Sequence, residues 1–438
     1  MGSGKFQKTS EFEQKKPFYM KRLLPTSHSL LPKATKSAIT IFTAMEYSLS
    51  NRMKDVSGSA IRELFELLKD PEIISFAGGW PTTETLPAKQ VESIVKDVVC
   101  KYGTTQVLQY ESSRGKPLLL ERLKHFLKEN KGLTFADENL VVISGGQQGI
   151  EYMCKLFVNE GDTVLVQDPT YLSTLQIVAT YQGKSVGVKA DANGLDLADL
   201  EEKIKVCKPK MLYVVPTFSN PTGGTYSVEN RKGIAEITAK YGVMVLEDDP
   251  YSQICYDGER IPPIKTFDKS GNIFYMASFS KIIAPSLRVA VIAGAPEIMG
   301  RFIIAKQSSD VCNSSISQLI VAEFLQGDIL KKHIETIIPV YREKRDKMLD
   351  CIKKYVPSDF VYDVPKGGMF IWGYFKSNRD VMADFKEILK SKVAMLPGTH
   401  FYADGGGKNT MRLNFSNASL EQIEKGIKII GDYVRTGN

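Results

Sequence analysis

The sequence has few of the residues that build covalent or metal-based frameworks. Its six cysteines are widely separated and include no Cys-x-x-Cys pair, and none of its four histidines is near another in sequence. This spacing argues against a disulfide framework or a zinc site and favours a reducing compartment, so we expect a cytoplasmic protein. No apolar run approaches the roughly 18 residues that a membrane helix needs. The cysteines are Cys100, Cys154, Cys207, Cys255, Cys312 and Cys351.

The charge excess is small and scattered. The net charge is +7 over 438 residues, with Lys and Arg spread along the chain. A scattered excess is typical of a solvated surface and does not predict a nucleic-acid partner, although it suits an anionic cofactor and carboxylate substrates. The hydrophobic fraction of 43% and the length fit a soluble protein with two domains.

The first fifty residues differ from the rest of the chain. They are rich in Lys, Ser and Thr and have no hydrophobic signal-peptide core. An organelle presequence would share that composition, but Glu11, Glu13 and the scarcity of arginine weigh against it. We therefore interpret residues 1–51 as an N-terminal extension that lies over the surface or over a partner subunit.

The middle of the chain alternates short apolar runs with helical patterns. This alternation predicts an α/β fold in which a mainly parallel sheet is sandwiched by helices. Ligands of such sheets bind at the carboxyl ends of the strands. The predicted strands are 140–144, 163–166, 211–215, 243–246, 273–277 and 289–293, and the predicted helices are 147–157, 171–181, 197–205 and 229–241.

The pattern changes after about residue 327, where a smaller α+β domain is predicted. A long charged helix at 329–354 precedes strand-like pieces at 369–374 and 410–415 and a final helix at 420–433. We expect residues 52–75 to pack with this small domain, which spans 328–438, and residues 76–327 to form the large domain.

The stretch Ser278-Phe279-Ser280-Lys281, with Arg288 seven residues later, is the most informative segment. It follows a predicted strand and presents an amine at the carboxyl edge of the sheet. Arg288 and the hydroxyls of Ser278 and Ser280 can bind a phosphate. A lysine beside a phosphate clamp suits a phosphorylated aldehyde cofactor, because the amine forms a Schiff base while the clamp holds the other end. Taken alone, the segment fits a solvated loop lysine at least as well.

Two other predicted strands also end in groups that a pyridine cofactor requires. A carboxylate such as Asp248 keeps a ring nitrogen protonated, and the charged ring then acts as an electron sink for a substrate carbanion. Asn220 and Tyr251 can donate to the phenolic oxygen of the ring. Each set could instead be a turn or a solvated strand end, but their ordered arrival at successive strand ends is hard to explain by chance.

From about Ser57 to its end, the chain resembles fold-type I pyridoxal-phosphate aminotransferases of the class I/II group. Within that group it is most similar to the 2-aminoadipate and kynurenine aminotransferases. The ordered set of motifs is highly specific, although each motif alone is not. The motifs are Phe76-Ala77-Gly78-Gly79, Gln109-Tyr110, Ser144-Gly145-Gly146-Gln147-Gln148-Gly149, Asp168-Pro169-Thr170-Tyr171, Asn220-Pro221-Thr222-Gly223, Glu247-Asp248-Asp249-Pro250-Tyr251, Ser278-Phe279-Ser280-Lys281, Met395-Leu396-Pro397-Gly398 and Met411-Arg412-Leu413.

The resemblance implies further contacts to pyridoxal 5'-phosphate. Gly146 and Gln147 open a helix after a strand, where backbone N–H groups and the helix N-terminus favour an anion, so they are expected at the cofactor phosphate. The family often has serine where Gly146 stands, which leaves only the backbone contact. Tyr171 is expected to stack on the ring. Tyr110 is expected to reach the phosphate of the other subunit in a homodimer with shared sites.

The resemblance also implies how the substrate is held. Arg412 stands between apolar residues, so its guanidinium either caps a surface edge or meets a buried anion, and the resemblance implies that it grips the substrate α-carboxylate bidentately. Arg62 is a helix-surface residue or, as the resemblance suggests, a contact to a distal carboxylate. Gly79 lets the backbone approach the substrate closely.

The implied reaction is transamination by a ping-pong mechanism, from an L-amino acid to a 2-oxo acid such as 2-oxoglutarate. Lys281, Asp248 and Tyr251 are the expected catalytic residues. The amino donor stays open among 2-aminoadipate, kynurenine, aromatic and branched-chain amino acids. One alternative is a lyase or synthase of the same fold. Another is a regulator that carries this domain behind a DNA-binding module, but only about fifty residues precede the match. A third is a structural protein that has lost the chemistry.

Overall fold

The computed structural model describes residues 50–54, 70–191 and 193–436. Residues 51–438 form one compact unit. The N-terminal extension, Arg62 and most of the segment expected at 52–75 lie outside the described residues. Near that segment the structure describes helix α2 (Asn51–Lys54) and strand β1 (Ile74–Ser75).

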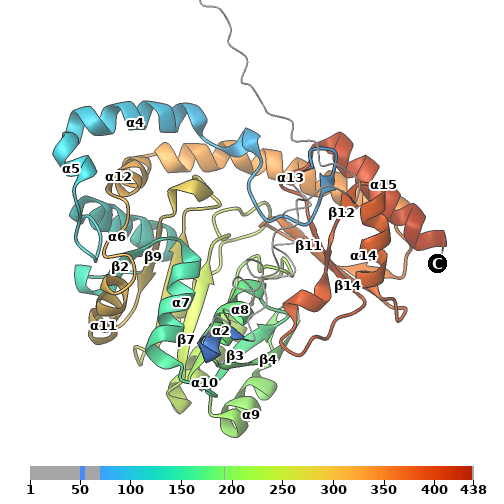
Figure 1. The fold of residues 1–438 in the computed structure, drawn as a ribbon, viewed down its shortest axis with the longest axis horizontal. Coiled ribbons are helices and arrows are strands. Elements are labelled where there is room, and N and C mark those ends of the chain that lie inside the picture. Colours follow the sequence, from blue (N-terminus) through green and yellow to red (C-terminus); the bar gives the residue numbers. More distant parts are fainter. Residues whose placement is uncertain (1–49, 55–69, 192, 437–438) are drawn as a thin grey trace, which may run out of the picture. The chain divides into compact units, whose positions relative to one another are not determined.

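An eight-stranded sheet lies at the centre of this unit (Figure 1), in the order β2-β9-β8-β7-β6-β3-β4-β5. The neighbours from β8 to β4 are parallel, whereas β9 is antiparallel to β2 and β8, and β5 to β4. The predicted α/β fold with a mainly parallel sheet is confirmed. The strands are β2 (Leu140–Ile143), β3 (Thr163–Asp168), β4 (Lys184–Asp191), β5 (Gly194–Leu195), β6 (Met211–Val214), β7 (Met244–Asp249), β8 (Ile273–Ser278) and β9 (Ala290–Ala293).

Successive side chains of a strand point to opposite faces of the sheet. Both faces therefore carry apolar side chains, and helices cover both. On one face, Val166 and Met276 belong to a core with Ile150 of α7 (Gly146–Phe157), beside α8 (Leu172–Thr180) and α11 (Pro296–Gln307). On the other, Leu165 and Leu212 pack in a separate core with residues of α9 (Leu197–Cys207) and α10 (Val228–Tyr241).

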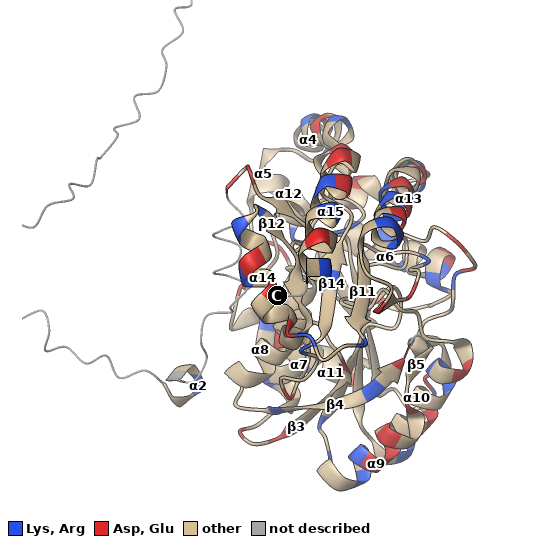
Figure 2. Ribbon diagram, turned by 90° about the vertical axis from the view of Figure 1, so that its right-hand side faces the viewer, with Lys and Arg blue, Asp and Glu red and all other residues tan. Residues whose placement is uncertain are grey.

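A group of helices lies beside the β2 edge of the sheet (Figure 1). Helix α12 (Ser315–Phe324) contacts α4 (Ala88–Tyr102), α5 (Thr104–Leu108) and α6 (Pro117–Lys131). Charges of both signs alternate along the outer helices, as α9 and α10 show in Figure 2. Among the described residues, every helix is too short or too polar to cross a bilayer.

The C-terminal part is built on a second, antiparallel sheet of order β10-β11-β14-β13. Helix α13 (Ile329–Tyr355) packs against α15 (Leu420–Thr436), and β1 pairs in parallel with β12. The remaining elements are β10 (Phe360–Tyr362), β11 (Phe370–Phe375), α14 (Val381–Lys390), β12 (Val393–Ala394), β13 (Leu396–Pro397) and β14 (Thr410–Asn414), with short 3-10 helices at Thr83–Thr85, Asp137–Asn139, Ile264–Phe267, Pro285–Leu287 and Gly398–Phe401.

Strand β7 extends further than its apolar run. The sequence places its end at Leu246, but the strand continues to Asp249 with three buried carboxylates. Burial is possible because two of them are fully bonded: Glu247 accepts from the backbone of Ile264 and Lys265, and Asp249 forms an ion pair with Lys131. The site is therefore built partly on strand rather than on loop.

Candidate active site

A cavity of about 300 Å³ lies where β6, β7 and β8 end, on the side of α7 and α8. Of the predicted site residues that the structure describes, all except Tyr110 line it. Tyr110 is 80% exposed and does not line this cavity. The predicted residues that line it are Gly79, Gly146, Gln147, Tyr171, Asn220, Asp248, Tyr251, Ser278, Ser280, Lys281, Arg288 and Arg412.

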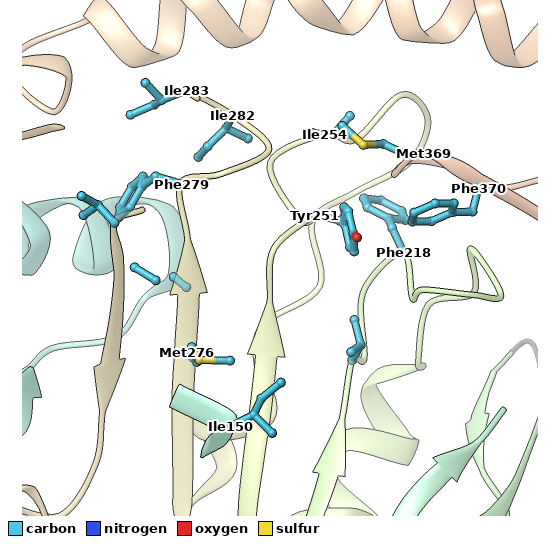
Figure 3. Close-up of a cluster of buried hydrophobic side chains, with 14 of the residues drawn as sticks. Ile150, Phe218, Tyr251, Ile254, Met276, Phe279, Ile282, Ile283, Met369 and Phe370 are labelled. Atoms are coloured by element: carbon cyan, nitrogen blue, oxygen red, sulfur yellow. The ribbon is translucent and has the colours of Figure 1, made fainter. Parts of the chain in front are cut away.

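The loop after β8 directs Lys281 into the cavity. Phe279, Ile282 and Ile283 on either side of it are buried in the core (Figure 3) and anchor the loop. The Nζ of Lys281 donates to the carbonyl of Gly79 at 2.5 Å. Burial, together with the guanidinium groups of Arg412 and Arg288, lowers the pKa of Lys281 to about 8. The amine is therefore neutral far more often than an exposed lysine, as a nucleophile or base must be.

Asp248 presents one free oxygen to the cavity. The hydroxyl of Tyr213, on β6, donates to Oδ2 of Asp248 at 2.8 Å. Its Oδ1 is buried, and no group of the described residues forms a hydrogen bond with it. The pKa of Asp248 is raised to about 7, mainly by burial and also by the charge of Asp249, against the lowering effect of the Tyr213 hydrogen bond. A buried carboxylate oxygen without a donor is costly, so this one fits a protonated ring nitrogen.

Arg412 is buried against two aromatic rings. Its guanidinium lies 4.4 Å from the ring centre of Phe370 and 5.0 Å from that of Phe401. It donates from Nη1 to Oδ1 of Asn220 at 2.7 Å and from Nη2 to the carbonyl of Ala77. Its Nε has no partner, and burial lowers the pKa of Arg412 to about 10. A buried cation with an open donor and no carboxylate partner suits an anionic substrate group.

The aromatic groups of the site come from two loops. Tyr171 stands directly before α8, and burial raises its pKa. Tyr251 packs edge-on against Phe370, with ring centres 5.7 Å apart, and Phe218 lies beside them (Figure 3). Burial raises the pKa of Tyr251 well above its ordinary value, so its hydroxyl is a donor at neutral pH.

The third side of the cavity is suited to a phosphate. Gly145 has φ +86°, and a Cβ there would collide with the guanidinium of Arg288, so glycine is required for the close approach. Arg288 donates to the carbonyl of Ser144 at 3.1 Å. The hydroxyls of Ser278 and Ser280 lie 3.2 Å apart. With the N-terminus of α7, these donors form an anion site.

Some cavity residues are missing from the sequence prediction. Trp80, which follows Gly79, could have been found from its position in the Phe76–Gly79 motif. Leu396, which stands in the motif Met395-Leu396-Pro397-Gly398, lines the cavity as well, and so does Tyr213, which only strand pairing brings there. The backbone of Ala77 contributes a carbonyl rather than a side chain.

Three features together fit pyridoxal 5'-phosphate. A half-buried amine of lowered pKa, an orphaned carboxylate oxygen and a glycine-lined helix N-terminus beside an arginine border one cavity. They match, in turn, the aldehyde, the ring nitrogen and the phosphate of that cofactor.

Comparison with known proteins agrees with this chemistry. Residues 71–430 match the model of the family "Aminotransferase class I and II". The chain is 35% identical over 395 residues to aromatic-amino-acid aminotransferase 1 of Thermococcus litoralis, covering 89% of this chain and 94% of the relative. It is 33% identical over 379 residues to the 2-aminoadipate transaminase of Thermus thermophilus, covering 86% and 94%.

A solved structure shares the whole fold. The kynurenine aminotransferase of Pyrococcus horikoshii, crystallised in complex with PMP, superposes with a TM-score of 0.85 at 35% identity, covering 89% of this chain and 97% of that chain. The family match, the shared fold and the cavity lead to one conclusion: the chain belongs to the class I and II aminotransferases and is a pyridoxal-phosphate-dependent transaminase.

Proposed function

We propose that this enzyme transfers the amino group of an L-amino acid of the 2-aminoadipate, kynurenine, aromatic or branched-chain type to a 2-oxo acid such as 2-oxoglutarate, by a ping-pong mechanism. The names of the relatives support aromatic, 2-aminoadipate and kynurenine donors. The observation that carries the proposal is the arrangement around one cavity of the Lys281 amine, the free Oδ1 of Asp248 and the open Nε of Arg412.

The cofactor contacts follow from the donors present. Gly146, Gln147, Ser278, Ser280 and Arg288 hold the phosphate. Tyr171 stacks on the ring, while Asn220 and Tyr251 donate to its phenolic oxygen. Asn220 can do so through its amide nitrogen, because its Oδ1 already accepts from Arg412.

The catalytic groups have separate tasks. When bound, the cofactor supplies a protonated ring that accepts the electron pair left on the substrate α-carbon. The Oδ1 of Asp248 keeps the ring nitrogen protonated. Lys281 would hold the cofactor through Nζ, and once the substrate has displaced this amine it would serve as the base that carries the proton of the substrate α-carbon. Its lowered pKa suits both roles.

The substrate is held at its carboxylates. Arg412 binds the α-carboxylate, and the small size of Gly79 lets the backbone lie close to the substrate. Arg62 binds a distal carboxylate such as that of 2-aminoadipate or 2-oxoglutarate. This role would distinguish dicarboxylic donors from aromatic and branched-chain donors. Arg62→Ala should therefore weaken the binding of 2-aminoadipate far more than the binding of leucine.

We propose a homodimer in which Tyr110 reaches the phosphate of the partner's site. Tyr110 and Leu108 are 80% and 76% exposed at the end of α5, which suits an interface. We also keep the cytoplasmic location, with which six unpaired cysteines are compatible. The division into a large domain (76–327) and a small domain (328–438) is supported by the two separate sheets.

A half-reaction screen tests the proposed function. Each candidate amino acid is added to the holoenzyme, and the absorbance of the lysine-bound cofactor is followed while the products are identified. Loss of that absorbance with formation of the 2-oxo acid and the aminated cofactor is expected. Release of ammonia with the cofactor restored would instead identify a lyase. The Lys281→Ala protein serves as the control that should show no turnover.

A further inference from the structure

Two neighbouring aspartates of β7 are held in the same way by tyrosines of the two flanking strands. Tyr213 of β6 pairs with Leu246, and its hydroxyl donates to Oδ2 of Asp248 at 2.8 Å. Tyr275 of β8 pairs with Glu247, and its hydroxyl donates to Oδ2 of Asp249 at 2.6 Å. In each case the aspartate lies two residues beyond the tyrosine's partner. The two contacts occupy opposite faces of the sheet, because neighbouring strand residues alternate.

The two carboxylates differ in what else they contact. Asp249 also accepts from Lys131 Nζ at 2.7 Å and from the backbone N–H of Ser252 at 3.0 Å, so both of its oxygens are satisfied. Asp248 has Tyr213 alone, and its Oδ1 has no partner. This oxygen faces the start of α7, where a Cβ at Gly146 would lie 3.7 Å from it. The Asp249 pair is complete in itself, whereas the Asp248 pair is complete only with a ligand.

The geometry points to Tyr213 as a positioning residue for transamination. We propose that its hydrogen bond to Oδ2 fixes the plane of the Asp248 carboxylate, so that Oδ1 is the oxygen presented to the ring nitrogen. A carboxylate turns easily about its last side-chain bond, and among the described residues the Tyr213 hydroxyl is the group that holds the Asp248 carboxylate by a hydrogen bond. The inference rests on the role proposed for Asp248.

The same hydroxyl helps to keep Asp248 charged. Burial and the nearby charge of Asp249 raise the pKa of Asp248, and the donation from Tyr213 opposes this rise, with a net pKa of about 7. The titratable groups near Asp248 include the phenols of Tyr171 and Tyr251, which are neutral at pH 7 because a phenol has an ordinary pKa of 10.0 and burial raises it further here. From β8, the neighbour at this point is the uncharged Met276. Removing the hydroxyl therefore favours the neutral acid, which cannot stabilise a cationic ring.

The test compares Tyr213→Phe with Tyr275→Phe, each of which deletes one buried hydroxyl from an aspartate and keeps the ring. Both holoenzymes are loaded with pyridoxal phosphate labelled with ¹⁵N in the ring, and the chemical shift of that nitrogen is recorded against pH. In Tyr213→Phe we expect the ¹⁵N chemical shift to move toward the value of an unprotonated ring nitrogen. This shift should also change with pH near neutrality. We also expect a first half-reaction slower by about ten- to a hundredfold, as for loss of a hydrogen bond to a charged group. In Tyr275→Phe the ring nitrogen should keep its wild-type shift.

Asp248→Asn, measured alongside, separates the inference from the role on which it rests. If Asp248→Asn leaves the nitrogen shift unchanged, both the role of Asp248 and the inference are overturned. If Asp248→Asn moves the shift but Tyr213→Phe behaves like Tyr275→Phe, only the inference is overturned. Adding Tyr213→Phe to Asp248→Asn should then cost little further activity, because the tyrosine acts through the carboxylate. Fully additive losses would contradict that coupling.

Discussion

The guanidinium of Arg412 donates to the side-chain oxygen of Asn220 at 2.7 Å, which joins β14 of the second sheet to the loop after β6 of the first. Asn220 is proposed to contact the cofactor and Arg412 the substrate, so one hydrogen bond links the two binding events. It also settles the orientation of the Asn220 amide, since the oxygen is occupied and only the nitrogen is left to donate elsewhere.

Replacing Arg412 should impair both substrates. Arg412→Ala removes one partner of a buried charge pair, which typically costs about 3–5 kcal/mol, or at least a hundredfold in affinity. KM should rise for the amino acid and for the oxo acid, while cofactor affinity, measured by titrating the apoenzyme, stays close to wild type. Arg412→Lys is the matched control, because it keeps the charge but loses the bidentate guanidinium. Its KM should lie between those of the wild type and Arg412→Ala. A rise in KM for only one of the substrates would contradict a shared α-carboxylate site.

Replacing Lys281 should abolish turnover but not cofactor binding. Lys281→Ala loses the covalent attachment and the proton carrier together, so activity should fall by many orders of magnitude. The phosphate donors at Arg288 and α7 remain, so the cofactor should still bind. In the wild-type enzyme, borohydride reduction followed by peptide mapping should find the cofactor on Lys281. Label on another lysine would refute the assignment.

The pH dependence of cofactor attachment follows from the same residue. Burial and two guanidinium groups lower the pKa of Lys281 to about 8, compared with 10.5 for a free lysine. Only the neutral amine attacks an aldehyde, so the attachment rate of cofactor to the apoenzyme should rise with pH through about 8 and then level off. Arg412→Ala removes one of the charges that lower this pKa, so its midpoint should lie at higher pH. A midpoint near 10.5 in the wild type would show that the amine is not buried in solution.

Replacing Asp248 should slow the chemistry while the protein stays folded. Asp248→Asn keeps the shape of the side chain but removes the negative charge that keeps the ring nitrogen of the cofactor protonated. The first half-reaction, followed by stopped-flow absorbance, should slow by several powers of ten, each worth about 1.36 kcal/mol of barrier. Because burial raises the pKa of Asp248, the neutral asparagine should not reduce the thermal stability of the apoenzyme at pH 8. Near-normal turnover would mean that another group protonates the ring.

The sequence predicts the elements whose residue patterns are strongest. Helices α7, α10 and α13 begin and end within one residue of the predicted ranges, because their helical residue patterns are strong. Strand β4 (Lys184–Asp191) is not predicted, since it mixes lysine, serine and glycine with valine and is largely only half-buried. The sequence predicts too early an end for β7, because carboxylates after an apolar run are typical of a solvated strand end. Burial of Asp249 is possible because of its ion pair with Lys131, which is far away in sequence.

Site residues that stand in local motifs can be predicted from the sequence. Site residues that depend on strand pairing cannot. Lys281, Asn220 and Asp248 stand directly after or near the ends of recognisable strands. Tyr213 sits in the middle of an apolar run and reads as core, because only the register of β6 against β7 places its hydroxyl on Asp248. No pattern in one strand contains that information.

The shared site of the proposed dimer can be tested with mixed subunits. Tyr110→Phe should weaken cofactor binding and leave the selectivity for substrate carboxylates unchanged, because the hydroxyl is expected to contact only the phosphate. In a heterodimer of one Lys281→Ala subunit and one Tyr110→Phe subunit, isolated by differential tags, an exchanged tyrosine puts both lesions into one site and neither into the other. The site that retains Lys281 should then bind the cofactor as tightly as wild type. Since Tyr110 is 80% exposed in its own chain, contact with its own site would require it to move. A heterodimer whose Lys281-bearing site still shows the weakening caused by Tyr110→Phe would place the tyrosine in its own subunit's site.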